Sequence, residues 1–201
     1  MAEAVRELDK NLVFGARLVA RYAPQFAQQT KLIPLHSRHT TATITFMNDQ
    51  LAILAVQEVM DKISQELQAK VPGMEFTVTY VPLPAIVQRH GLGRGENVLG
   101  IEYSKRDLII AYATLSWLDS EFDGVMETAV RKWVEETNTV SEELGASHPF
   151  IYHNFAGSFQ DPLCSYGPEN VEFLREVSKK YDPERVFQTL VPGGFKVDTD
   201  C

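Results

Sequence analysis

The sequence predicts an α+β fold in which one antiparallel β-sheet is backed by helices on one face, as in a ferredoxin-like domain. Three observations support this. Residues 40–46 and 75–81 alternate apolar and hydroxyl side chains, which is the period of a half-buried strand. Residues 50–70 and 120–144 repeat apolar residues at helical spacing. Several strands also follow one another without an intervening helix.

The elements expected along the chain are five strands and at least four helices. The strands are expected at residues 40–46, 75–81, 98–103, 108–115 and 150–155, with residues 104–107 short enough for a hairpin. Helices are expected at residues 3–29, with a break at Pro24, and at 50–70, 120–144 and 168–181. The chain then divides into a helical segment at 1–30, an α+β domain at 31–163 and a C-terminal helix and tail at 164–201.

Local signals set the ends of these helices. Asp49 is a good N-cap for the second helix and Asp119 or Ser120 for the third, where Ser120 with Asp123 has the spacing of a capping box. Gly145 is expected to end the third helix, and Pro168 suits the first turn of the fourth. The buried positions expected in these three helices are Ala52, Val56, Val59, Ile63 and Leu67; Phe122, Met126, Ala129, Trp133, Val140 and Leu144; and Val171, Leu174 and Val177.

Composition and charge exclude several classes of function. The 201 residues carry a formal net charge of −8, so nucleic acid and anionic membrane surfaces would repel the chain. No window approaches the ~20 apolar residues of a membrane span. A bridge between Cys164 and Cys201 would tie down only a tail, so both are expected to be free thiols. Together these features predict a soluble, cytoplasmic protein.

A row of hydroxyl side chains is the clearest oddity. If Ala42, Ile44 and Phe46 face the helices, then the opposite face of the sheet carries the threonines. These are Thr41, Thr43, Thr45, Thr77 and Thr79. Short hydroxyl side chains leave room above a sheet and supply hydrogen-bond donors and acceptors. The face is the floor of a pocket, an interface, or a solvated strand surface.

A C-terminal run of residues carries a resemblance to a known family. The run is Phe150-Ile-Tyr-His-Asn-Phe-Ala-Gly-Ser-Phe-Gln-Asp-Pro162, followed by Ser165-Tyr-Gly, Tyr181-Asp-Pro and Val191-Pro-Gly-Gly-Phe-Lys196. Weaker matches upstream are Tyr80-Val-Pro-Leu-Pro84, Asn97-Val-Leu-Gly100 and Trp117-Leu-Asp119. Over roughly residues 35–196 the sequence resembles the substrate domain of berberine-bridge-type FAD-linked oxidoreductases.

The resemblance implies a fold and a site. In that family the free face of the sheet lies over the flavin ring, and an Asn-Tyr pair approaches the cofactor; Asn154 and Phe155 stand at that pair here. The family usually has Tyr-Ala-Asp where this chain has Phe155-Ala-Gly157. No segment resembles the family's flavin-binding half, so the chain is expected to lack it and to bind no FAD without a partner chain. No metal is expected either.

Individual residues then become candidates for a site. His153, Tyr80 and Tyr103 are the candidate catalytic acids or bases, since imidazole titrates near neutrality and a phenol can donate to a carbonyl. A satisfied core histidine and packed aromatics are the alternatives. The candidate substrate-binding residues are Thr43, Thr45, Thr77, Thr79, Glu102 and Asn154.

The function expected first is a cofactor-free cyclase or isomerase, such as a Diels–Alderase, that acts on a hydrophobic natural-product intermediate. Such reactions need orientation more than a nucleophile. The alternatives are the substrate-domain half of a split FAD-dependent oxidoreductase and a non-catalytic dimerisation or binding module. The expected partners are a small hydrophobic substrate, a second copy in a homodimer, and a flavin-domain chain.

Overall fold

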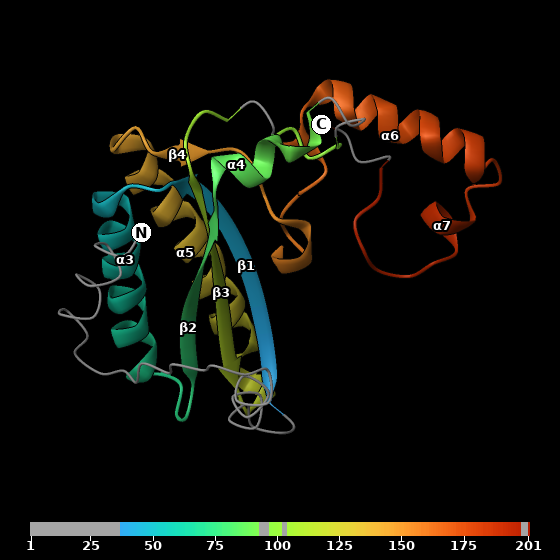
Figure 1. Ribbon diagram of the computed structural model, residues 1–201. Coiled ribbons are helices and arrows are strands. Elements are labelled where there is room, and N and C mark those ends of the chain that lie inside the picture. The colour runs from blue at the N-terminus through green and yellow to red at the C-terminus, as the bar shows by residue number, and fades with distance from the viewer. Residues whose placement is uncertain (1–36, 93–96, 102–103, 198–200) are drawn as a thin grey trace, which may run out of the picture.

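The computed structural model describes residues 37–92, 97–101, 104–197 and 201, so the expected helix at 3–29 lies outside the described residues (Figure 1). The fold is α+β, as predicted. Its sheet is antiparallel and four-stranded in the order β2-β3-β1-β4. The strands are β1 (Arg38–Met47), β2 (Glu75–Leu83), β3 (Leu108–Trp117) and β4 (Ser147–His148).

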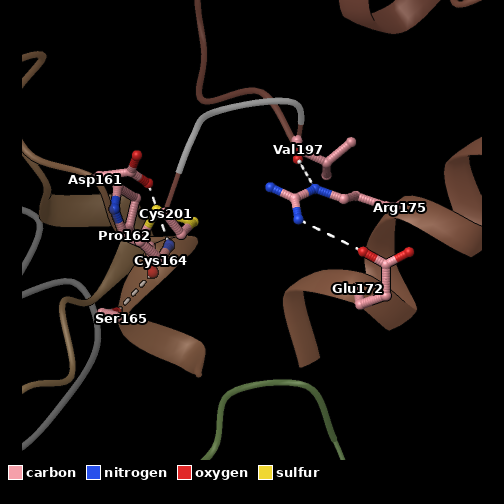
Figure 2. Close-up of a disulfide and its surroundings, with 8 residues drawn as sticks. All are labelled: Asp161, Pro162, Cys164, Ser165, Glu172, Arg175, Val197 and Cys201. Carbon is pink, nitrogen blue, oxygen red and sulfur yellow. Dashed lines mark hydrogen bonds and ion pairs between the residues drawn. A yellow bond between two sulfur atoms is a disulfide. The ribbon is translucent and has the colours of Figure 1, made fainter. Parts of the chain in front are cut away.

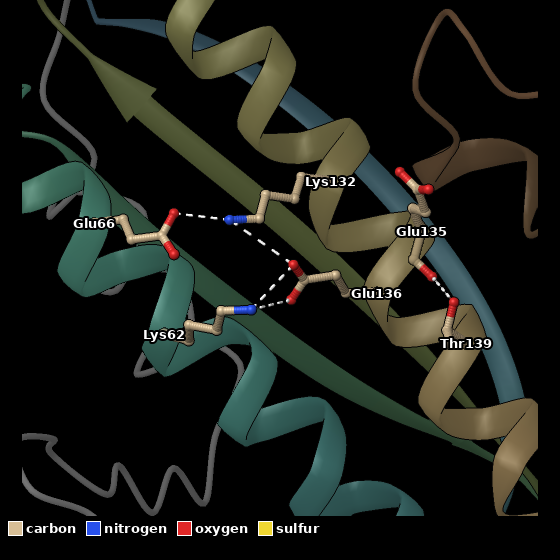
Figure 3. A network of polar contacts seen from close by, with 6 residues as sticks. All are labelled: Lys62, Glu66, Lys132, Glu135, Glu136 and Thr139. Atoms are coloured by element: carbon tan, nitrogen blue, oxygen red, sulfur yellow. Dashed lines mark hydrogen bonds and ion pairs between the residues drawn. The ribbon is translucent and has the colours of Figure 1, made fainter.

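The two long helices, α3 (Gln50–Gln68) and α5 (Asp123–Glu143), cover one face of the sheet (Figure 1). Ala42, Ile44 and Phe46 of β1 point into the core beneath them, as the alternation predicted. Trp133 of α5 is the largest fully buried side chain there. Exposed ion pairs also join the helices, with Lys132 Nζ 2.8 Å from Glu66 and Lys62 Nζ 3.1 Å from Glu136 (Figure 3).

The ends of the long helices follow the sequence only in part. Gly145, at φ 62°, terminates α5 as expected. The capping box is wrong, because Ser120–Phe122 forms a separate 3₁₀ turn and α5 begins at Asp123. Asp119, the other predicted cap, does cap that turn by accepting from the Glu121 N–H at 3.0 Å. The Asp123 carboxylate is already bound by Arg38 at 2.6 Å and by the Trp117 ring N–H at 2.8 Å. Leu144, expected in the core, is 44% exposed.

Asp49 caps α3 as predicted. Its carboxylate accepts from the backbone N–H of Leu51 at 2.9 Å and of Ala52 at 3.3 Å. We expect Asp49→Ala to lower the free energy of unfolding by about 1 kcal/mol, because two amide groups lose their partner. Urea denaturation tests this, with Asn48→Ala as the control at the adjacent position. Equal midpoints for the two variants would contradict the capping role.

Two of the five expected strands are wrong. Described residues 97–101 form a turn, with Gly100 at φ 71°, and without that strand there is no hairpin at 104–107. The segment 150–155 is irregular and ends in a 3₁₀ turn, His153–Phe155. Pro149 follows β4 and has no N–H to continue the ladder. The apolar residues of both segments instead pack in a second core, which explains their strand-like pattern.

This second core covers one end of the other face of the sheet. Its buried members are Ile101, Ile110, Phe150, Leu163 and Tyr166. It is completed by the C-terminal arm, which we define as α6 (Pro168–Tyr181), α7 (Val186–Thr189) and the tail to Val197 (Figure 1). Pro168 stands in the first turn of α6, as predicted, and Val171 is its buried residue.

The cysteines are not free thiols, which corrects the sequence prediction. Cys164 and Cys201 form a disulfide with Cα atoms 5.3 Å apart (Figure 2). The tail folds back instead of hanging free: Arg175 Nε donates to the Val197 carbonyl at 3.0 Å, and the Val197 N–H donates to Gln188 at 3.1 Å. The thiol argument for a reducing compartment therefore fails. Among the described residues, no helix is long and apolar enough to cross a bilayer.

Candidate functional site

The threonines do share the face opposite α3 and α5. We call this the threonine face and define it by three rows of residues aligned across β1, β3 and β2. The rows are Thr41–Thr114–Thr77, Thr43–Tyr112–Thr79 and Thr45–Ile110–Val81. Period-two alternation is enough to predict this arrangement, because each register position fixes which side chains share a face.

The threonine face has a covered half and an open half. Thr43 and Thr45 are 0% and 3% exposed, and the Thr43 hydroxyl already donates to the Ala111 carbonyl at 3.0 Å. Thr77 and Thr79 of β2 are exposed. Of the four threonines expected to bind substrate, only the two on β2 are therefore exposed on the open half of this face.

An aromatic stack borders the open half. Phe155 lies on Tyr112, with ring centroids 4.2 Å apart and planes 22° from parallel. Tyr152 meets Phe155 edge-on at 4.9 Å. Asn154 is exposed and donates from Nδ2 to the Tyr152 hydroxyl at 3.0 Å. Asn154 and Phe155 thus reach the threonine face from a 3₁₀ turn, and the strand expected there is not needed.

Gln160 fixes this segment to the sheet. Its side-chain amide accepts from the Thr43 N–H at 3.0 Å and donates to the Thr43 carbonyl at 2.7 Å. The same oxygen accepts from the Gly157 N–H at 3.0 Å. The side chain therefore continues the β1 ladder where β4 has ended. Gly157 is buried, and a Cβ there would collide with the Thr41 carbonyl, so the residue that departs from the family pattern is one that this packing requires.

The two described candidate acid–base residues, His153 and Tyr80, are not brought together. His153 is half-buried, with its ring edge-on to Phe195 at 5.0 Å. Tyr80 lies on the helix side of the sheet, where its hydroxyl is 3.4 Å from Gln57 and burial raises its pKa. Tyr103, like the candidate Glu102, lies outside the described residues. His153 is the one that neighbours Asn154 and Phe155.

His148 is a residue whose role the sequence did not indicate. It lies directly opposite Thr45 across the β1–β4 pair, and its Nδ1 accepts from the Phe150 N–H at 3.2 Å. Burial lowers its pKa below the ordinary value of 6.5. The neutral ring is therefore favoured, and with Nδ1 acting as an acceptor, its proton sits on Nε2. The short strand β4 sets this geometry, and no spacing rule reveals it.

This lowered pKa predicts a pH dependence of stability. Below pH 6.5 the unfolded chain binds a proton at His148 more readily than the folded chain does. The free energy of unfolding therefore decreases as the pH is lowered, until the pH falls below the folded-state pKa of His148. We expect wild type to lose more stability than His148→Phe between pH 7 and pH 5.5, as measured by urea denaturation. Parallel losses in the two proteins would contradict this.

The described residues do not fit the pyrophosphate of a flavin dinucleotide. Such a group commonly sits at a helix N-terminus, where positive potential and free N–H groups attract it. Each long helix here carries a carboxylate in that place: Asp49 at α3, Asp123 at α5 and Glu169 at α6. Among the residues that the structure describes, there is also no cluster of three or more His, Cys, Asp or Glu suited to a metal.

Comparisons with known proteins point to flavin enzymes. No model of a protein family matches the chain. The chain is 33% identical over 167 residues to the FAD-dependent monooxygenase sdcF of Emericella nidulans, covering 82% of the chain and 35% of that protein. It is 34% identical over 171 residues to the FAD-dependent monooxygenase FUP4 of Fusarium proliferatum, covering 81% and 32%.

A third relative is named as a synthase and not as a monooxygenase. The chain is 30% identical over 174 residues to the bifunctional solanapyrone synthase of Alternaria solani, covering 85% of the chain and 33% of that protein. The chain thus spans about a third of the length of these relatives. Over most of its own length it is similar to FAD-dependent monooxygenases, which confirms the resemblance to FAD-linked enzymes at this coarser level.

Proposed function

We propose that the chain forms the substrate-binding wall of an FAD-dependent oxidoreductase of natural-product biosynthesis. The observation that carries the proposal is the open half of the threonine face beside the Tyr112–Phe155 stack. Exposed hydroxyls at Thr77 and Thr79 offer hydrogen bonds, and the stacked rings offer a flat apolar surface. Such a surface suits a planar, oxygenated, largely hydrophobic molecule.

The flavin in this proposal is held by a partner chain. The names of the relatives support an FAD-dependent reaction, while the three helix N-termini disfavour a pyrophosphate. His153 and Asn154 are the acid–base and substrate-binding candidates at this surface, because they flank the stack. We include in this proposal that the oxidation is of the berberine-bridge type, as the sequence resemblance implies.

The cofactor part is tested by the absorbance spectrum of the purified chain. We expect no flavin band near 450 nm after gel filtration, and no saturable binding when FAD is added in titration calorimetry. A stoichiometric flavin band that survives gel filtration would contradict the proposal.

The binding part is tested with emodin, a planar hydroxyanthraquinone, by quenching of the intrinsic fluorescence. We expect Phe155→Ala to weaken emodin binding about two- to tenfold, which is the worth of one aromatic contact. The matched control is Phe187→Ala, which removes an aromatic side chain that is 65% exposed on α7. Equal affinities for the two variants would exclude the stack as a binding surface.

A cofactor-free cyclase or isomerase, including a Diels–Alderase, is the second candidate function. A surface that can orient a substrate without a flavin favours it, and one relative is named a bifunctional synthase instead of a monooxygenase. Deleting the gene would separate the two: an uncyclised precursor accumulates if the chain is a cyclase, whereas an unoxidised product accumulates if it serves an oxidoreductase. No change in metabolites would count against both.

The proposal also includes a partner that covers the exposed apolar side chains of the C-terminal arm. The C-terminal arm exposes apolar side chains, with Tyr181 73%, Phe187 65% and Leu190 75% exposed. Apolar surface of this kind is typical of an interface. We expect either a flavin-bearing chain or a second copy to cover it, and a non-catalytic dimerisation module would use the same surface. Sedimentation velocity distinguishes a monomer from a homodimer.

A further inference from the structure

A groove of about 420 Å³ lies at the β1–β4 edge of the sheet, between α5 and the segment that follows β4. Its volume is within the ~300–1,000 Å³ range of small-molecule sites. Ile44, Val134 and Phe159, which belong to the core under the helices, line it together with Phe150 of the second core. Arg131 of α5 lies 4.1 Å over the Phe159 ring and holds that ring in place.

The groove exists because the β1 ladder is interrupted. β4 pairs with Thr45 and Phe46 and then stops at His148, since Pro149 has no N–H to donate. The ladder resumes only at Thr43, where the Gln160 side chain takes the place of a strand. The backbone that a longer β4 would supply is therefore missing beside β1, and side chains line the space in its place.

Two polar groups give the groove a chemical character. His148 lines it, and because Nδ1 already accepts from Phe150, Nε2 is the ring nitrogen left for a ligand. Opposite His148 in the register, the Thr45 hydroxyl is buried and has no hydrogen-bond partner among the described residues. A carboxylate, Glu142, also lines the groove and disfavours anions.

We propose that this groove is a second small-molecule site that takes a neutral, carbonyl-bearing aromatic compound. The apolar walls hold the ring system, and the Nε2–H group of His148 donates to the carbonyl oxygen. The groove is lined by Thr43 and Thr45 of the covered half of the threonine face and depends neither on its open half nor on a flavin, so it stands whether or not the function proposed above is correct.

The test uses prodan, a neutral naphthalene ketone whose emission reports hydrogen bonding to its carbonyl. We expect prodan to bind wild type with a blue-shifted emission. His148→Phe should weaken binding about two- to tenfold, the worth of one neutral hydrogen bond, and should shift the emission further to the blue. The matched control is His90→Phe, an exposed histidine that does not line the groove, which should bind prodan as wild type does.

A second variant covers the case in which His148→Phe perturbs folding. Val134→Trp fills the groove from α5 and should abolish prodan binding while circular dichroism stays unchanged. Emodin affinity, measured on the same proteins, should fall for Phe155→Ala and not for Val134→Trp. Wild-type prodan binding by folded Val134→Trp would overturn the proposal, as would an absence of saturable prodan binding to wild type.

Discussion

Reducing the Cys164–Cys201 disulfide is expected to lower the free energy of unfolding by roughly 4 kcal/mol. The two cysteines are 37 residues apart, and the chain-entropy model gives about this value for a loop of that length. The loop contains the C-terminal arm, whose α6 buries only Val171 fully, so the arm depends strongly on the cross-link. Urea denaturation with and without dithiothreitol measures the effect.

A matched variant separates the bond from the reagent. Cys201→Ser removes the bond at an exposed position, so its midpoint should equal that of reduced wild type and should not respond to dithiothreitol. If dithiothreitol leaves the wild-type midpoint unchanged, the bond contributes nothing to stability, and the packing of the tail against Arg175 must hold the arm (Figure 2).

Gly157→Asp is expected to have the second large effect. The substitution restores the residue that the flavin-enzyme family usually has at this position, yet we expect it to lower the free energy of unfolding by about 1–3 kcal/mol, as overpacking does. A Cβ there collides with the Thr41 carbonyl and lies 2.8 Å from the Phe159 ring. The segment from Asn154 to Gln160 would have to move off the sheet.

Gly157→Asp should also weaken emodin binding, for the same structural reason. Displacing this segment shifts Phe155 from Tyr112, so emodin affinity should fall together with stability. Gly157→Ala should show a smaller loss of stability, because it adds no buried charge. Ser158→Ala, at the exposed neighbour, is the control and should match wild type. A stable Gly157→Asp protein with full emodin affinity would mean that the segment is not clamped.

Local pattern was sufficient for β1, β2, β3 and the two long helices, but not for β4. The alternation in 40–46 and 75–81 gave the correct faces, and Asp49 and Gly145 marked real helix ends. It failed where tertiary contacts replace strand pairing. Apolar residues at 98–101 and 150–155 read as strands because a second core demands the same apolar spacing.

The rest of the candidate site depends on contacts between distant residues. Gln160 completes the β1 ladder from 117 positions away, and no propensity scale contains that contact. Cys201 meets Cys164 across 37 positions, and the contact of Arg175 with the Val197 carbonyl holds the tail near α6. The candidate role of His148 depends on its position in a two-residue strand and on the hydrogen bond that it accepts from the Phe150 N–H. The face on which Thr77 and Thr79 lie could be predicted, because the alternation along β2 is enough to assign it.

Chemical-shift mapping of the ¹⁵N-labelled chain with emodin is the sharpest test of the claim that the threonine face binds the substrate. The claim predicts that the largest shifts fall on the open half of the threonine face and on the stack, at Thr77, Thr79, Tyr112 and Phe155. Shifts confined to the β1–β4 groove or to the C-terminal arm, with these four amides unmoved, would contradict the claim that the threonine face binds the substrate.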